Sequence, residues 1–93
     1  MHAEKEVTMM ISHFQRFLDE ATIPDPESDH PLGPDCLYGL YTSWCLLHRI
    51  GPVSDIAFRA AMRRLGIDIY HVRLEMAGPA AADYILASYP GTP

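Results

Sequence analysis

Three arginines stand close together in the second half of the chain. Arg59 and Arg63 are four residues apart, and Arg64 follows directly. On a helix, side chains four residues apart lie on the same face, so Arg59 and Arg63 project together with Arg64 beside them. Guanidinium groups placed in this way donate hydrogen bonds to guanine edges and to phosphates in the major groove of DNA. The same spacing is also typical of a solvated helix face, and both interpretations stay open.

Other polar residues could add phosphate contacts around these arginines. Ser54 is expected to cap the helix that carries them. Arg49 and His48 come before that helix in the sequence, and His71 and Arg73 come after it. The candidate DNA-contacting residues are Ser54, Arg49, Arg59, Arg63, Arg64 and Arg73.

Residue types that serve catalysis or metal binding are present but scattered. Cys45 and His48 are three residues apart on one expected helix, a spacing that suits a thiol–imidazole pair or half of a metal site. No second close pair of cysteine or histidine completes a zinc site. The chain also has no phosphate-binding glycine loop and no nucleophile motif. We therefore expect packing or surface roles for these residues, with no catalytic residue, no metal, no cofactor and no enzyme activity.

Two helices and the break between them would position the arginines. The first is expected over 35–49, ended by Gly51 in the left-handed conformation and by Pro52 beyond it. The second begins after Ser54, has Asp55 in its first turn and ends at Gly66. The apolar residues of these two helices repeat at helical spacing, namely Leu37, Leu40, Tyr41, Trp44 and Leu47, then Phe58, Ala61, Met62 and Leu65.

The rest of the chain supplies a further helix on each side and one strand. Residues 3–21 are helical in pattern, with an apolar stripe on one face. Residues 22–34 contain four prolines and are expected to form a linker without regular structure. Residues 69–76 alternate as a half-buried strand does, and Pro79 begins a last helix that ends near Ser88. The stripe of the first helix consists of Val7, Met10, Ile11, Phe14, Phe17 and Leu18.

The string LYGLYTSWCLLHRIGPVSDIAFRAAMRRLGI carries a family resemblance. It resembles the C-terminal winged-helix module of phage and plasmid primase-helicases, in which an aromatic-rich helix ending in a Trp-Cys pair precedes a turn and a Phe-containing recognition helix. The resemblance implies DNA binding, while the ATPase and primase chemistry of that family lies outside this module. The matching positions are Leu37, Tyr38, Tyr41, Trp44, Cys45, Pro52, Ser54, Phe58, Leu65 and Gly66. Separately, the tail GPAAADYILASYP resembles small proteins of actinobacterial phages and integrated elements.

Charge and composition limit the classes of protein that fit. The 93 residues make one domain-sized chain with 48% hydrophobic residues, and no apolar run is long enough to cross a bilayer. The net charge of −5 is uneven, because residues 1–35 carry −6 and residues 36–93 carry +1. Without a secretion signal at the start and with two unpaired cysteines, a cytoplasmic location is expected.

The sequence thus predicts a mainly α fold, a winged-helix-like helix-turn-helix with four helices and one short strand or minimal wing. We divide the chain into an acidic amphipathic helix (1–21), a Pro-rich linker (22–34) and the helix-turn-helix domain (35–93). The favoured function is binding of double-stranded DNA; the alternative is a non-catalytic protein-interaction module, such as a phage protein that binds a host protein through its acidic helix or its strand. A lone strand leaves an open edge, and pairing with a second copy would close it, so a homodimer is expected.

Overall fold

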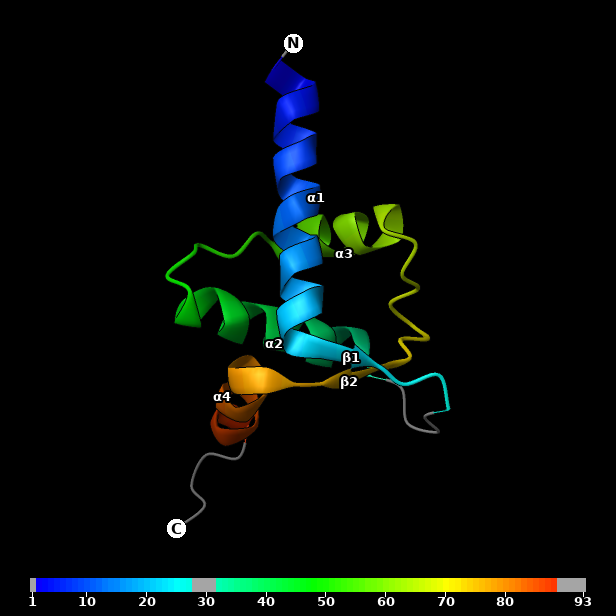
Figure 1. Ribbon diagram of the computed structural model, residues 1–93, viewed down its shortest axis with the longest axis vertical. Coiled ribbons are helices and arrows are strands. Elements are labelled where there is room, and N and C mark those ends of the chain that lie inside the picture. Colours follow the sequence, from blue (N-terminus) through cyan, green and yellow to red (C-terminus); the bar gives the residue numbers. More distant parts are fainter. Residues whose placement is uncertain (1, 28–31, 89–93) are drawn as a thin grey trace.

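The structure is a computed structural model that describes the backbone of residues 2–27 and 32–88, and side chains within 12–27 and 32–87. It contains four helices and a two-stranded sheet (Figure 1). The mainly α fold predicted from the sequence is confirmed, and the arrangement is consistent with a small helix-turn-helix domain that has a minimal wing. In chain order the elements are α1 (His2–Ala21), β1 (Thr22–Pro24), α2 (Pro34–Leu47), α3 (Asp55–Arg64), β2 (Leu74–Met76) and α4 (Gly78–Ser88).

The sheet corrects the prediction that residues 22–34 lack regular structure. β1 lies in this segment and pairs antiparallel with β2, with Thr22 opposite Met76 and Pro24 opposite Leu74. Asp25 continues the pairing by donating its N–H to the Arg73 carbonyl at 2.9 Å. The strand after α3 therefore has a partner within its own chain, so the prediction of a lone strand was wrong, while the homodimer stays a prediction.

The strand predicted over 69–76 is shorter than expected because a turn interrupts it. The Asp68 carboxylate accepts the N–H of Tyr70 at 3.0 Å, and the Asp68 carbonyl accepts the N–H of His71. Aspartate closes such turns with its own side chain. As a result Ile69 and Val72 are both buried and Tyr70 is 66% exposed, so the strict alternation predicted over 69–76 fails at Ile69 and Tyr70, and regular pairing begins only at Leu74.

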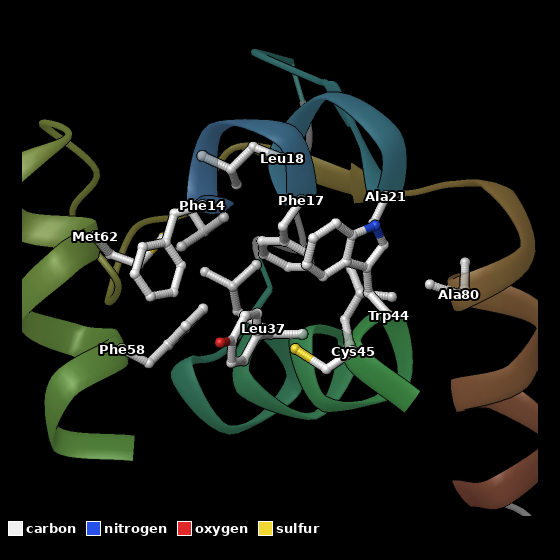
Figure 2. Close-up of a cluster of buried hydrophobic side chains, with 14 of the residues drawn as sticks. Phe14, Phe17, Leu18, Ala21, Leu37, Trp44, Cys45, Phe58, Met62 and Ala80 are labelled. Carbon is white, nitrogen blue, oxygen red and sulfur yellow. The ribbon is translucent and has the colours of Figure 1, made fainter. Parts of the chain in front are cut away.

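One hydrophobic core joins α1, α2 and α3 (Figure 2). Phe14 and Phe17 of α1 lie between Phe58 of α3 and Trp44 of α2, with ring centroids 5.7–6.1 Å apart for three of these four pairs. Tyr41 is fully buried among them. The predicted core positions of these helices are confirmed for Phe14, Phe17, Leu18, Leu37, Leu40, Tyr41, Trp44, Phe58 and Met62.

All three parts of the division made from the sequence contribute to this one core. The second half of α1 supplies Phe14 and Phe17, β1 pairs with the strand that precedes α4, and Leu32 packs against the core. The remaining predicted stripe residues Val7, Met10 and Ile11 lie outside the described side chains. The helix-turn-helix therefore does not fold around α2 and α3 alone, since α1 fills the space between them.

The prediction was right for the carboxyl end of α3 and wrong for the carboxyl end of α2. Gly66 has a φ of 80° and ends α3 as expected. The left-handed residue after α2 is Arg49, with a φ of 56°, and not Gly51. The Ile50 N–H reaches back to the Cys45 carbonyl at 2.9 Å, so the helix closes earlier than the sequence suggested.

Gly78 joins β2 to α4 at a point that a side chain would disturb. Its φ is 76°, and a Cβ there would lie 2.9 Å from the Glu20 carbonyl oxygen of α1. We expect Gly78→Ala to lower the free energy of unfolding by about 1–3 kcal/mol, because alanine is strained in this conformation. Urea denaturation measures the change.

Gly51→Ala is the matched control for this substitution. Gly51 lies in the loop after α2, a Cβ at this position would have open space within 4 Å, and the residue has no left-handed φ. Its replacement should change the stability by no more than about 1 kcal/mol, in the stabilising direction if at all. Equal losses in the two variants would contradict this account of Gly78.

Candidate nucleic-acid interface

The helix that carries the arginines is fixed at its start by a cap and along its inner face by the core. The Ser54 hydroxyl accepts the Ala57 N–H at 3.2 Å, which confirms the predicted N-cap of α3. Phe58 and Met62 are buried on the inner face. Because these two side chains must be buried, the opposite side of α3 faces solvent.

Two tyrosines of α2 hold the loop that leads into α3. The Tyr38 hydroxyl donates to the Val53 carbonyl at 2.7 Å, and the Val53 N–H donates to the Tyr41 hydroxyl oxygen at 3.2 Å. The Phe58 ring packs against both tyrosines, with centroids 5.4 Å and 4.8 Å away. Both backbone polar groups of Val53 are satisfied, so the start of α3 has a fixed position on α2.

A histidine of α1 completes this arrangement. His13 Nε2 lies 2.8 Å from the Tyr41 hydroxyl oxygen. When His13 is neutral with an unprotonated Nε2, the Tyr41 hydroxyl can donate to this nitrogen while its oxygen accepts the Val53 N–H. Burial lowers the pKa of His13, with nearby Arg16 adding to the effect, and burial raises the pKa of Tyr41. Both side chains therefore favour the uncharged forms that this bond needs.

Arg59 is engaged by two carboxylates. Its Nε donates to Asp55 Oδ1 at 2.9 Å on α3, and a terminal nitrogen reaches Asp35 Oδ1 at 3.3 Å on α2. The hydrogen bond to Asp55 is the main reason that the pKa of Arg59 is raised. The guanidinium connects α3 to the start of α2, and only 27% of the side chain is exposed.

Arg63 and Arg64 are in a different situation. Both lie in the last turn of α3 and are exposed. Within the part of the chain whose side chains are described, neither has an ion-pair partner. Their position at the carboxyl end of the helix is favourable for the helix dipole. Of the three arginines on α3, these two are therefore available to contact an anionic ligand.

A cavity of 310 Å³ opens beside these arginines. Arg59 and Arg63 line one side, and the turn 66–70 lines the other with Asp68, Tyr70 and the residues around them. The Asp68 carboxylate is held by the Tyr70 N–H and by His71 Nδ1 at 2.9 Å, and the pKa of Asp68 is lowered by these bonds. The cavity therefore combines positive, negative and aromatic groups next to the end of α3.

The structure places the six predicted DNA-contacting residues in three regions. Arg59, Arg63 and Arg64 share α3, and Ser54 caps its opposite end. Arg73 is exposed just before β2 and lines a separate 630 Å³ cavity that shares residues 66–68 with the smaller one. Arg49 lies in the loop after α2, and this loop and the carboxyl end of α3 are on opposite sides of α1 (Figure 1). The structure thus brings the α3 arginines together and sets Arg49 apart.

Asp35 and Tyr70 were not among the candidate DNA-contacting residues predicted from the sequence. Asp35 is 24 residues away from Arg59, and no local pattern joins the two. Tyr70 was assigned to a strand, although an aspartate two residues earlier is a turn signal that would have placed it in a loop. The histidines beside the candidate arginines also have partners, since His48 Nε2 lies 3.2 Å from Glu20 and His71 pairs with Asp68.

The thiols and imidazoles do not assemble into a reactive site within the described residues. Cys45 is buried next to Tyr41, and burial raises the pKa of its thiol. Among the side chains described, no group of three histidine, cysteine or acidic residues is placed to hold a metal ion.

No protein-family model, curated protein or solved structure matches this chain. The resemblance to the primase-helicase module therefore stays a prediction. Of the described helices, none combines the length and the apolar character needed to cross a membrane.

The neutral state of His13 makes the stability of the protein depend on pH. In the unfolded chain His13 titrates near 6.5, whereas in the folded protein its pKa is lower. Below pH 6.5 the unfolded state therefore binds the proton first, and the free energy of unfolding falls as the pH drops. We expect denaturation midpoints to decline between about pH 7 and pH 5.

His13→Gln should remove this decline, because glutamine is neutral throughout the range and can still accept from Tyr41. His71→Gln, which changes an exposed histidine, should leave the decline in place. The lowered carboxyl pKa values of Glu20 and Asp68 act in a more acidic range. An unchanged pH profile in His13→Gln would show that the His13–Tyr41 contact does not select the neutral imidazole.

Proposed function

We propose that this protein is a non-enzymatic DNA-binding module that docks α3 against duplex DNA. The observation that carries the proposal is the contrast between the two faces of α3. Phe58 and Met62 fix the inner face in the core, while Arg63 and Arg64 extend from the exposed side without carboxylate partners among the described residues. A helix that is fixed on the core and carries guanidinium groups free of carboxylate partners is well suited to contact phosphates and base edges.

The outer surface of α3 also suits close approach to a groove. A helix of ten residues is about 15 Å long, and the major groove is about 12 Å wide and admits such a helix. Ala60 is small and exposed, and Ile56 is 82% exposed, so an apolar side chain is available for a thymine methyl group. The length of α3 and the small and apolar residues on its exposed face are therefore compatible with docking in a major groove.

The acidic groups around α3 limit the strength of this binding. Asp55 and Asp35 hold Arg59, and Asp68 stands beside the cavity. With a net charge of −5 the whole protein is repelled by DNA at long range. We therefore propose modest affinity with a strong salt dependence, and a homodimer on a two-fold symmetric site would strengthen it by presenting two copies of α3. A cytoplasmic location is part of the same proposal.

A second candidate function rests on exposed apolar residues elsewhere. Leu46 and Leu47 at the end of α2, and Ile85 and Leu86 on α4, are exposed. An apolar cavity of 420 Å³ lies between these two helices, lined by Trp44 and Leu47 together with the first turn of α4. Exposed apolar surface of this kind marks protein contacts. A protein-interaction module is accordingly the alternative if DNA is not bound.

Replacement of both unpaired arginines tests the proposed function. We expect Arg63→Ala/Arg64→Ala to weaken binding to a fluorescent duplex from the protein's own upstream region by about tenfold or more. The slope of log K against log salt should become shallower by about 2, since two phosphate contacts are lost. Fluorescence anisotropy over a range of salt concentrations gives both quantities.

Arg49→Asn is the control, because it removes one positive charge from the loop on the other side of α1 and because asparagine tolerates the left-handed backbone there. It should leave the slope close to that of the parent protein. If the folded protein does not bind duplex DNA at low salt, or if the double variant binds as tightly as the parent, the proposed function is wrong.

Release of Arg59 from one of its carboxylates gives a further test. Asp35 is 97% exposed, so Asp35→Asn removes a charge without disturbing the core. We expect duplex affinity to rise roughly twofold to fivefold, because Arg59 becomes available to a phosphate and a repelling charge is lost.

Asp83→Asn makes the same charge change on α4, which lies below α2 in Figure 1 whereas α3 lies above it. It should have little effect. An equal gain in the two variants would mean that only net charge matters and that the contact between Asp35 and Arg59 does not.

A further inference from the structure

The cavity at the end of α3 contains a group that neither the fold nor the core explains. Tyr70 is 66% exposed, so burial does not account for an aromatic side chain there. It lines the 310 Å³ cavity together with Arg59 and Arg63. An exposed ring next to guanidinium groups is the arrangement on which nucleobases stack.

The mixed charge of the lining selects among possible ligands. Asp68 lines the same cavity, and its carboxylate is held there by Tyr70 N–H and His71. A bare anion such as phosphate would be attracted by Arg63 and repelled by Asp68. A nucleotide can make a favourable contact with each of these groups. Its phosphate can pair with Arg63, its flat base can stack on Tyr70, and a donor on the base edge can hydrogen-bond to an oxygen of Asp68.

The shape of the site decides between paired and unpaired bases. A base inside a duplex is stacked on both faces and cannot enter a concave site. Ligand pockets in proteins start at about 300 Å³, so this cavity is at the small end of the range and suits a single base. An unpaired nucleotide next to a duplex satisfies both conditions, with the duplex on α3 and the free nucleotide in the cavity.

We propose that the cavity formed by Arg59, Arg63 and the turn 66–70 receives one unpaired nucleotide of DNA, stacked on Tyr70, beside the duplex that α3 contacts. This inference rests on the proposed function, since α3 must hold the duplex nearby. It makes the protein a binder of junctions between double-stranded and single-stranded DNA and assigns Tyr70 as the residue that distinguishes them from blunt duplex.

The test compares a blunt duplex with the same duplex carrying a short single-stranded overhang that contains 2-aminopurine. Anisotropy of a distant label gives affinity, and quenching of 2-aminopurine fluorescence reports stacking. We expect the overhang to raise affinity about tenfold, in line with stacking of one base on an aromatic ring, and to be quenched on binding. Tyr70→Ala should abolish both effects and leave blunt-duplex binding unchanged, while Tyr70→Phe should keep both.

The outcomes separate this inference from the proposed function. If blunt and overhang duplexes bind equally and Tyr70→Ala changes neither, the unpaired-nucleotide site is wrong while DNA binding by α3 stands. If neither duplex binds to the folded protein, the proposed function fails and the inference falls with it. A gain from the overhang that persists in Tyr70→Ala would place the unpaired strand elsewhere and would also overturn the site.

Discussion

The burial of Tyr41 is the interaction on which the rest of the structure depends. Its ring centroid lies within 5.4 Å of those of Phe14 and Phe17 of α1 and 4.8 Å from that of Phe58 of α3, so one side chain of α2 contacts both neighbouring helices. Its hydroxyl meets His13 and the Val53 N–H. A buried hydroxyl without partners would be costly, and both partners come from segments that must therefore be in place together. The position of α3, and with it the position of every arginine on that helix, follows from this packing.

The arginines of α3 differ in whether a carboxylate already binds them. Arg59 pairs with Asp55 on its own helix and with Asp35 at the start of α2, whereas Arg63 and Arg64 are exposed. Exposed ion pairs contribute little to stability, so the main consequence of the Arg59 contacts is to neutralise a charge beside the candidate interface. Protein–DNA affinity depends on the number of phosphates neutralised, so with two outward arginines on an acidic chain the proposed DNA binding would be weak and sensitive to salt. A second contact, such as base stacking on Tyr70, adds selectivity that charge alone does not provide.

Local patterns in the sequence were sufficient for the helices, the cap at Ser54 and the buried faces that carry Tyr41 and Phe58, because helical periodicity and capping depend on residues a few positions apart. They were not sufficient for β1, whose pairing with β2 depends on a partner far along the chain, nor for the contact between Asp35 and Arg59. The arginines could be found from the sequence, and the pair of Asp55 and Arg59 is also local, since the two residues are four positions apart on α3. The second partner of Arg59, Asp35, could not be found, because its position is set by the packing of α2 against α3. Tyr70 was misplaced because strand alternation was followed through a turn that Asp68 closes.

We propose that nucleic acid contacts this protein at α3 and at the turn that follows it. Backbone amide chemical shifts of the labelled protein, recorded while a short duplex with a single-stranded overhang is added at low salt, locate the contact directly. We expect the amide signals of the outward residues of α3 and of the turn 66–70 to shift, and those of α4 and of the loop after α2 to stay unchanged. Shifts confined to α4 and the end of α2, or no shifts at all in the folded protein, would contradict it.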